Sequence, residues 1–277
     1  MQHRLRLGAA FLTLLLTAVS AQAMAVVTAV PALNLRSGPG TGYAILRQLP
    51  AGTVVSVDGS SGAWRKVHVG SAVGWVSGAW LRDLSTSYTS CTSTAHIGDS
   101  LSAYVLPGLR TEYTARGVKS FKASAYGGRG VLQKVSGDPE TGQAAATRIR
   151  GTGFAGCWVV ALGTNDTANV AAGAWYSRAT AIDRMMSAID PYKKSRVMWV
   201  NTFTTRTTGY WSNYNMRLWN DALASAKSRW PNLRVFDWSV TASTGAATYA
   251  DGIHHTSSGY TVRNRSIAAA LAMYFPR

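Results

Sequence analysis

Short apolar runs, each followed by a polar or glycine-rich loop, recur through the C-terminal part of the chain. Amphipathic stretches such as AWYSRATAIDRMMSAID and MRLWNDALASAKSRW lie between several of them. Strands alternating with helices predict a parallel sheet covered on both faces, in which ligands bind beyond the carboxyl ends of the strands. We therefore expect the polar loops to meet at one edge of the sheet. The runs and their loops are AHI before GDS, GVKSFKASA before YGGRG, CWVVAL before GTND, RVMWVNTF before TTRTTG and LRVFDWSV before TASTG.

Residues 27–85 have a different pattern of apolar and turn-forming residues. Short alternating runs lie between closely spaced turn signals, namely RSGPGTG, LPAGT, DGSSGAW and HVGSAVGW. Such spacing predicts a small all-β barrel. The Ser/Thr-rich stretch STSYTSCTST then predicts a linker at 86–94 and a second domain at 95–277.

The start of the chain resembles a leader rather than part of either domain. MQHRLRLG is basic, AAFLTLLLTAVS is apolar, and AQA ends at Ala23. This order predicts a secretory signal peptide at 1–23, cleaved after about Ala23. The apolar run is short for a membrane span, and no later segment has the necessary length. We therefore expect a secreted protein without a membrane span.

The composition predicts a folded and strongly basic protein. The chain is 47% hydrophobic and 14% charged, with a formal net charge of +16. Such a charge favours association with polyanions, for example teichoic acids, anionic lipid surfaces or acidic polysaccharides. Scattered lysines and arginines that simply keep a secreted protein soluble are an equal alternative. The chain has no basic helix, zinc-ligand spacing or stacking-aromatic motif, so nucleic acid is not expected as a partner.

Ser100 is the candidate nucleophile of the second domain. A serine needs a base within hydrogen-bond reach, a group that orients the base, and donors for the developing oxyanion. GDS places Ser100 at a strand end, and DGIHH places Asp251 where its carboxylate can reach back to His254. Taken alone, Ser100 is an ordinary helix cap and His254 a structural histidine. His255 is left out of the mechanism, and His96 is expected to support the Ser100 turn.

Two further loops offer oxyanion donors. YGGRG can present a backbone N–H from Gly128, or from Gly127 if the loop is shifted by one residue. GTND places the side-chain amide of Asn165 after the third strand, although a capping role explains such an Asn equally well. Each loop is a weak signal when taken alone.

Taken in order, GDS at 98–100, a glycine near 128, GTND at 163–166 and DGIH at 251–254 resemble the four motif blocks of the SGNH hydrolases, or GDSL esterases. The resemblance spans about residues 92–277. It implies a flavodoxin-like, three-layer α/β/α fold around a parallel sheet. It also implies attack by Ser100, proton transfer by His254, orientation by Asp251, and an oxyanion hole formed by Ser100, Gly128 or Gly127, and Asn165. Asp99 and Asp166 brace their turns, and neither a cofactor nor a metal is needed.

The first domain resembles bacterial SH3-like domains. LNLRSGPGTGYAILRQLPAGTVVSV, WRKV and VGWVSGAWL follow that family's order over nearly its whole length. Such domains commonly bind peptidoglycan, so the resemblance implies the cell wall as a partner. Trp64, Trp80 and Tyr43 are the candidate wall contacts, with a place in the barrel core as their alternative. Trp75 is expected in that core.

The two cysteines predict one structural disulfide. Cys91 lies nine residues before Ser100, and Cys157 lies eight before Asn165. If the two strands are parallel neighbours, both sulfurs sit at matching depth at the base of the sheet, and an exported protein favours their oxidation. Metal binding is disfavoured, because neither cysteine has a partner at ligand spacing.

The first functional hypothesis is a secreted esterase that removes acetyl or other short acyl groups from cell-wall or extracellular polysaccharide. Polysaccharide O-acetyltransferase, secreted lipase and non-catalytic cell-wall-binding protein are the alternatives. The run VMWVNTFTTRTTGYW…PNLRVFDW resembles the corresponding part of SGNH domains acting on wall polysaccharides, but TTRTTG replaces the proline-containing loop expected there. Tyr210 and Trp211 either line a sugar cleft or pack on the surface.

Overall fold

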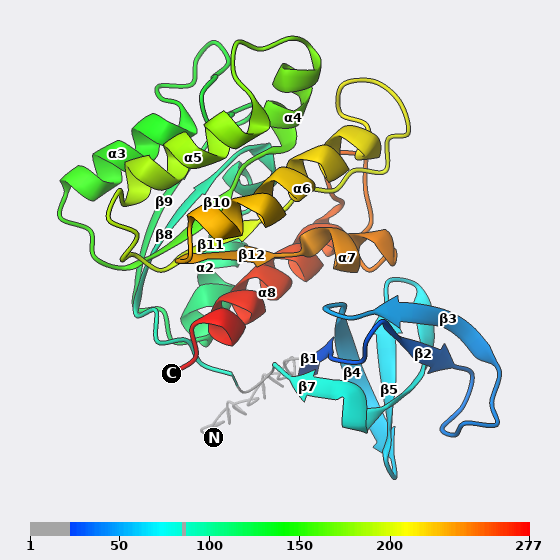
Figure 1. Cartoon of the computed structure of the whole chain (residues 1–277). Helices are drawn as coiled ribbons and strands as arrows, with labels where there is room; N and C mark the ends of the chain where they lie inside the picture. The colour runs from blue at the N-terminus through cyan, green and yellow to red at the C-terminus, as the bar shows by residue number, and fades with distance from the viewer. Residues whose placement is uncertain (1–22, 85–86) are drawn as a thin grey trace, which may run out of the picture.

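The computed structural model describes residues 23–84 and 87–277. It comprises an antiparallel β-region at 23–84 and an α/β region at 87–277 (Figure 1). The predicted signal peptide lies outside the described residues apart from Ala23, as do Ser85 and Thr86 at the predicted junction. No helix in either described range is long and apolar enough to span a membrane.

A seven-stranded antiparallel sheet forms the β-region, in the order β3-β2-β6-β5-β4-β1-β7. Six of its strands contribute aliphatic side chains to one core, including Leu35, Leu49 and Val67, so the sheet wraps around that core. This is the SH3-like architecture that the turn-rich sequence predicted. The elements are β1 (Ala23–Val27), β2 (Ala32–Arg36), β3 (Ile45–Pro50), β4 (Val54–Ser61), β5 (Trp64–Val69), β6 (Ala72–Ser77), the 3-10 helix η1 (Gly78–Trp80) and β7 (Leu81–Asp83).

Two details of the β-region differ from the sequence prediction. Strand β1 begins at Ala23, four residues before the expected boundary, and pairs with both β4 and β7. The prediction that Trp75 fills the core is wrong. Successive residues of a strand face opposite sides, and in β6 the neighbours Gly74 and Val76 are buried while Trp75 is half-buried and lies outside the core cluster.

The α/β region contains a five-stranded parallel sheet, with one strand at each predicted apolar run. Its order, β12-β11-β10-β8-β9, is the flavodoxin-like order. Gly98 pairs in register with Ala125 on one side and with Ala161 on the other, so three strands end level. The loops that follow them therefore begin at one edge of the sheet. The strands are β8 (Ser93–Gly98), β9 (Ser120–Ala125), β10 (Cys157–Ala161), β11 (Val197–Val200) and β12 (Leu233–Phe236).

Helices cover both faces of this sheet (Figure 1). Helices α3, α5 and α6 pack with Trp158 and Trp199 on one face, whereas α2 and α8 pack with Val159 and Met198 on the other. Side-chain oxygens cap the N-termini of α3, α5, α6 and α8. The three-layer prediction is confirmed. The helices are α1 (Ser100–Ala103), α2 (Leu106–Ala115), α3 (Gly142–Gly151), α4 (Thr164–Ala171), α5 (Arg178–Ile189), α6 (Asn213–Arg229), α7 (Trp238–Ser243) and α8 (Ser257–Tyr274).

The predicted disulfide between Cys91 and Cys157 is present. Cys157 begins β10, and Cys91 lies two residues before β8, its parallel neighbour. Both cysteines are buried. The bond therefore lies at the amino ends of the strands, opposite the edge that receives the polar loops.

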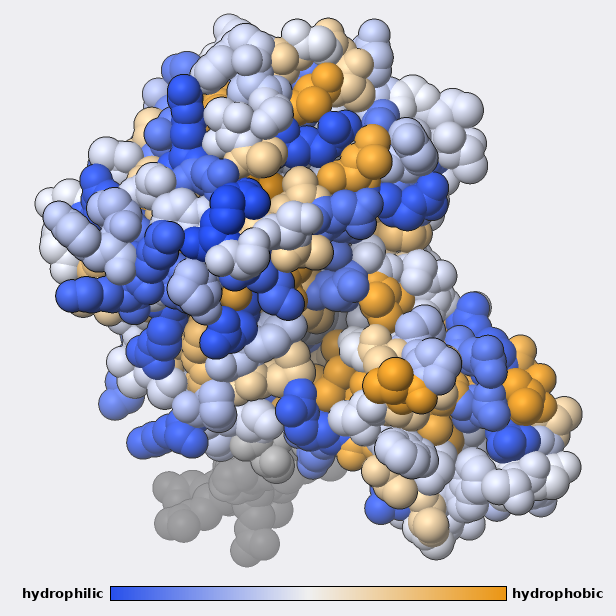
Figure 2. Space-filling view, viewed as in Figure 1, coloured by the Kyte–Doolittle hydropathy of each residue, from blue (hydrophilic) through white to orange (hydrophobic). Residues whose placement is uncertain are grey.

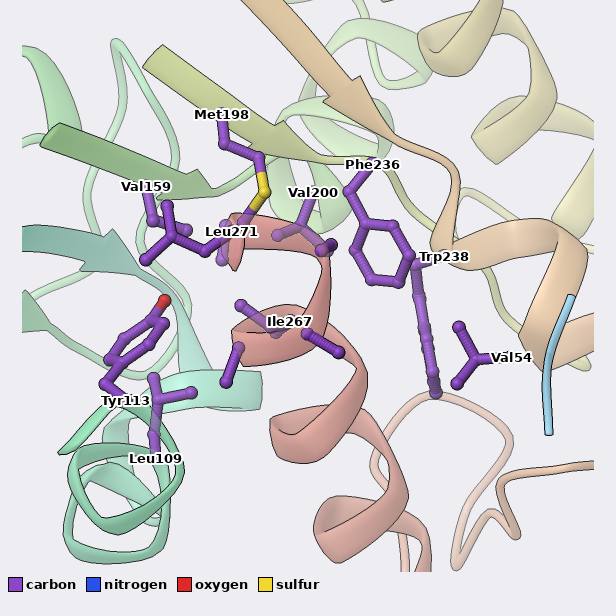
Figure 3. Packing of buried hydrophobic residues seen from close by; sticks show 14 of the residues in the cluster. Val54, Leu109, Tyr113, Val159, Met198, Val200, Phe236, Trp238, Ile267 and Leu271 are labelled. Atoms are coloured by element: carbon purple, nitrogen blue, oxygen red, sulfur yellow. The ribbon is translucent and has the colours of Figure 1, made fainter. Parts of the chain in front are cut away.

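The two regions share a core. Val54 of β4 lies against Trp238 of α7 (Figure 3), and Met24, Val26 and Leu84 belong to the same buried cluster. The Val54 N–H also donates to Thr241 Oγ1 at 3.2 Å. The β-region is therefore seated on α7 and α8, on the face of the sheet opposite α3, α5 and α6.

Candidate active site

Ser100 begins α1, directly beyond the end of β8. Asp99 caps this short helix, because its Oδ1 accepts from the Leu101 N–H at 3.0 Å. A Cβ on Gly98 would lie 2.5 Å from Ser102 Oγ, so only glycine fits the tight approach of strand to helix. The GDS sequence thus folds into a sharp turn whose third residue is Ser100.

Ser100, His254 and Asp251 form a hydrogen-bonded relay. Ser100 Oγ lies 2.9 Å from His254 Nε2, and His254 Nδ1 lies 2.7 Å from Asp251 Oδ2. In the tautomer protonated at Nδ1, the imidazole donates to the carboxylate and accepts from the hydroxyl. This arrangement can transfer the serine proton to the histidine.

Asp251 is fixed by its own turn as well as by the imidazole. Its Oδ1 accepts from the N–H groups of Ile253 at 2.8 Å and His254 at 2.7 Å. Partial burial acts to raise the pKa of Asp251, but the imidazole and the two N–H groups outweigh it and hold that pKa below its usual range. The carboxylate therefore stays ionised beside His254.

The loop after β11 supports this turn, a role that the sequence did not reveal. Thr205 donates its N–H to the Gly252 carbonyl at 2.9 Å, and Arg206 donates from Nη2 to the Asp251 carbonyl at 3.2 Å. The TTRTTG segment thus contacts the backbone of the Asp251 turn. The one signal in the sequence was that TTRTTG follows a strand, β11, whose carboxyl end lies at the same edge of the sheet as Ser100. Tyr210 and Trp211 of this loop are 55% and 37% exposed.

Asn165 is the second residue of α4, where the chain leaves β10. Its Nδ2 donates to the carbonyl of Arg129 at 3.1 Å, which joins the third loop to the second. Gly163 precedes α4 with a φ of +135°, and a Cβ there would overlap the indole of Trp219. The glycine of GTND is therefore required by both backbone and packing.

The glycine pair lies in a tight turn closed by the Arg129 N–H donating to the Tyr126 carbonyl at 3.3 Å. Gly128 has a φ of +76°, which favours glycine at that position. In the described part of the chain, neither Gly127 nor Gly128 donates its N–H to another backbone group. Both N–H groups remain candidate oxyanion donors.

Two buried carboxyl groups brace the turns, as expected for Asp99 and Asp166. Burial raises the pKa of Asp99 to about 6, although Arg263 and the Leu101 N–H oppose the rise. Burial raises the pKa of Asp166 to about 7, against its hydrogen bonds from the Val131 N–H and the Tyr176 hydroxyl.

The other two histidines near the site are structural. His96 contacts Ser102 Oγ at 2.9 Å and the Tyr113 hydroxyl at 3.2 Å, and burial lowers its pKa to about 3. His255 packs against aromatic rings, including that of Trp238, and burial lowers its pKa to about 3 as well. Both imidazoles therefore stay neutral over the ordinary pH range, which agrees with the supporting role expected of His96 and with the absence of His255 from the relay.

Arg263 of α8 was missed by sequence analysis. Its buried guanidinium donates to the Leu101 carbonyl at 3.0 Å and so holds the helix that begins with Ser100. Within 23–84 and 87–277, no group of three His, Cys, Asp or Glu side chains could hold a metal ion.

Comparison with known proteins identifies the β-region. Residues 31–82 match the family model described as Bacterial SH3 domain. The β-region is a bacterial SH3 domain. A protein of Bacillus subtilis (strain 168), YrvJ, named as an N-acetylmuramoyl-L-alanine amidase, is 41% identical over 51 residues, which are 18% of this chain. The match covers 10% of that protein's length.

Solved structures resemble the α/β region. The C-terminal catalytic domain of Streptococcus pneumoniae peptidoglycan O-acetyltransferase A is 15% identical with a TM-score of 0.50, covering 66% of this chain and 92% of that one. The lipase/acylhydrolase from Enterococcus faecalis is 16% identical with a TM-score of 0.52, covering 66% and 97%. At such identities the likeness concerns the fold, and the α/β region has the SGNH-hydrolase fold.

Two of the three candidate wall contacts meet on the SH3 domain. Trp64 and Trp80 line a cavity of about 320 Å³ together with Arg36 and Thr41. Trp80 is 53% exposed, and Trp64 is half-buried. Tyr43 is also exposed but does not line this cavity.

Proposed function

We propose that this chain is a secreted serine esterase that removes acetyl or other short acyl groups from cell-wall or extracellular polysaccharide. The observation that supports the reaction best is the relay in which Ser100, His254 and Asp251 are joined at 2.9 and 2.7 Å. A base held by a carboxylate and in contact with a serine hydroxyl is the arrangement that activates such a nucleophile.

The reaction proceeds in two acyl transfers. Ser100 Oγ attacks the ester carbonyl while its proton passes to His254 Nε2. The oxyanion accepts hydrogen bonds from the Ser100 N–H, the Gly128 or Gly127 N–H and the Asn165 amide. His254 then protonates the leaving alcohol, the ester C–O bond breaks, and an acyl-serine remains. Water attacks it with His254 as base, which releases the acid and restores Ser100.

The SH3 domain and the charge of the chain support a wall polymer as the substrate. Bacterial SH3 domains commonly bind peptidoglycan, and the aromatic cavity of Trp64 and Trp80 offers a surface for it. Exposed cations also run along α3, α5 and α6, where hydrophilic side chains gather in Figure 2, and a positive face favours anionic wall polymers. The signal peptide proposed at 1–23 provides export to that location. Of these exposed cations, Arg150, Arg184, Arg217 and Lys227 have no acidic partner among the described residues, whereas Arg148 and Arg229 are paired with Glu140 and Asp183.

Acetyl transfer to a sugar is the second candidate function. The similar structure from Streptococcus pneumoniae is named as a peptidoglycan O-acetyltransferase. Transfer would use the same relay and the same acyl-serine, with a sugar hydroxyl in place of water. An oligomer of N-acetylglucosamine added during turnover separates the two functions, because transfer yields an O-acetylated oligomer at the expense of free acetate.

The deciding experiment compares hydrolysis of p-nitrophenyl acetate and p-nitrophenyl palmitate. We expect acetate hydrolysis that disappears in Ser100→Ala and persists in Ser257→Ala, an exposed serine three residues after His254. Cleavage of palmitate as well would favour the lipase alternative. If the wild type hydrolyses neither ester, the esterase is rejected. Labelling of Ser100 by a phosphonate would then separate a transferase from a non-catalytic wall-binding protein.

Wall binding is tested separately on isolated peptidoglycan. Sedimentation with the polymer should fall in Trp80→Ala and Trp64→Ala, because each removes one wall of the aromatic cavity. Ser100→Ala should sediment as the wild type does. Equal sedimentation of all four proteins would place the wall contact elsewhere.

A further inference from the structure

A buried ion pair lies in the loop between β9 and α3. Arg129 donates to both carboxylate oxygens of Asp138, from Nε to Oδ2 at 2.9 Å and from Nη2 to Oδ1 at 2.6 Å. Their side chains are 2% and 0% exposed. Arg129 Nη1 also donates to Ser124 Oγ at 2.8 Å, at the end of β9. One guanidinium therefore joins the start of the loop to its far end.

The backbone of the same residue contacts both of the proposed oxyanion elements. The Arg129 N–H closes the turn that contains Gly127 and Gly128, and the Arg129 carbonyl accepts from Asn165 Nδ2 at 3.1 Å. An asparagine amide has two N–H donors, so this bond uses one and leaves the other for a ligand. The position of residue 129 thus sets both the turn and the orientation of the Asn165 amide.

We propose that Arg129, held by Asp138, is a positioning residue for the oxyanion hole. This inference rests on the proposed function, in which the glycine turn and Asn165 bind the oxyanion. Oxyanion donors act through their placement at the site where charge develops, and a displacement of about 1 Å can cost about a hundredfold in rate. Arg129 acts through the groups that touch the substrate and does not touch it itself.

Other contacts hold the later part of the loop independently of the ion pair. Val131 donates its N–H to Asp166 Oδ1 at 2.8 Å, and Gly142 donates its N–H to the Gly130 carbonyl at 3.0 Å. Loss of the ion pair should therefore act first on the turn at 126–129, which lies between these contacts and β9.

A double-mutant cycle on ester hydrolysis tests the proposal, using Arg129→Gln, Asn165→Ala and the pair together. We expect Asn165→Ala to lower kcat by about 10² to 10³ and Arg129→Gln by about 10 to 10², both with little change in KM. Because both substitutions act on the same oxyanion hole, the kcat of the double variant should match that of Asn165→Ala within about threefold.

Arg229→Gln is the matched control. It removes another arginine–carboxylate pair, in which Arg229 donates to Asp183 Oδ1 from Nε at 3.1 Å and from Nη2 at 3.0 Å. This pair joins α6 to α5, and within the described residues no hydrogen bond links it to the turn at 126–129 or to Asn165. Its kcat should stay within about twofold of the wild type, as expected for an exposed pair. Multiplicative losses in the cycle, or unchanged kcat in a folded Arg129→Gln, would overturn the proposal. If Arg129→Gln does not fold, Asp138→Asn takes its place with the same expectations.

A second readout separates this inference from the proposed function. The side-chain amide resonances of Asn165, assigned by their loss in Asn165→Ala, should shift in Arg129→Gln and stay in place in Arg229→Gln. If the wild type has no Ser100-dependent turnover, the proposed function fails, and the amide resonances alone test whether Arg129 positions Asn165. Asn165 resonances that do not shift in Arg129→Gln would overturn the positioning role of Arg129.

Discussion

Replacing Cys91 and Cys157 together by alanine should destabilise the folded chain by about 4 kcal/mol, because their bond closes a loop of 66 residues. In the chain-entropy account, the crosslink restricts the unfolded chain, and its effect grows with the logarithm of loop length. The parallel pairing of β8 with β10 remains after the substitution. The folded structure should therefore persist with less stability.

Urea unfolding of the oxidised wild type and the double variant measures this loss. With a slope of about 3 kcal/mol per M, 4 kcal/mol lowers the midpoint by roughly 1.3 M. Tryptophan fluorescence reports the unfolding of both regions, because the chain has ten tryptophans, including the buried Trp158, Trp199 and Trp219 of the α/β region. Ester hydrolysis reports the Ser100 edge alone. Coincident transitions would justify a two-state treatment of this two-region chain. In the absence of urea, kcat should be unchanged, since the cysteines lie at the opposite end of the strands from Ser100.

Three results would refute this reasoning. Two free thiols in the intact mass of the purified protein would mean that the bond does not form. A midpoint shift below about 0.3 M, or roughly 1 kcal/mol, would mean that the unfolded chain gains little freedom when the bond is removed. A several-fold loss of kcat in a folded double variant would mean that the base of the sheet and the reactive edge are coupled.

Two further predictions concern a buried carboxyl group and the seat of the SH3 domain. Burial raises the pKa of Asp166 to about 7, so between about pH 4 and 7 the folded chain keeps a proton that the unfolded chain releases. As the pH rises from about 4 to 7, the unfolding free energy of the wild type should therefore fall relative to that of Asp166→Asn. Parallel pH profiles of the two proteins would contradict this prediction. A Cβ on Gly70 would overlap the Gly245 carbonyl, whereas one on Gly62, also at positive φ, meets open space. Gly70→Ala should therefore cost about 1–3 kcal/mol more than Gly62→Ala in thermal unfolding, and equal losses would contradict the contact.

The strands and the order of the site could be predicted from sequence for a physical reason. A parallel strand buried on both faces appears as a continuous apolar run, and the chain must become polar where it leaves the sheet. Ser100, Asn165 and the Asp251 turn lie where such runs end or where the last helix begins, so chain order alone placed them at one edge. The disulfide could be predicted by the same depth argument, applied at the opposite end of the strands.

The rest depended on contacts that leave no periodic signal. β1 was missed because AMAVV continues the apolar run that precedes it. Trp75 was misplaced because its strand, AVGWVS, carries a valine on each face, Val73 and Val76, so the pattern does not show which face is buried. Arg129 and Asp138 lie nine residues apart in an irregular loop, so nothing in their spacing indicates a buried pair. The contact of the SH3 domain with α7 and α8 likewise joins regions that are far apart in the chain.

Helix α8 explains how the relay is held although its two ends lie 154 residues apart. The helix starts at Ser257, three residues after His254. Its N-cap residue, Thr256, follows the Asp251 turn with only His255 between it and His254. Arg263, the seventh residue of the helix, donates to the Leu101 carbonyl and so holds α1, the short helix that begins with Ser100. The same helix thus holds His254 at its start and Ser100 from its side. Its buried face, which includes Ile267 and Leu271, packs on the sheet and makes that spacing rigid (Figure 3).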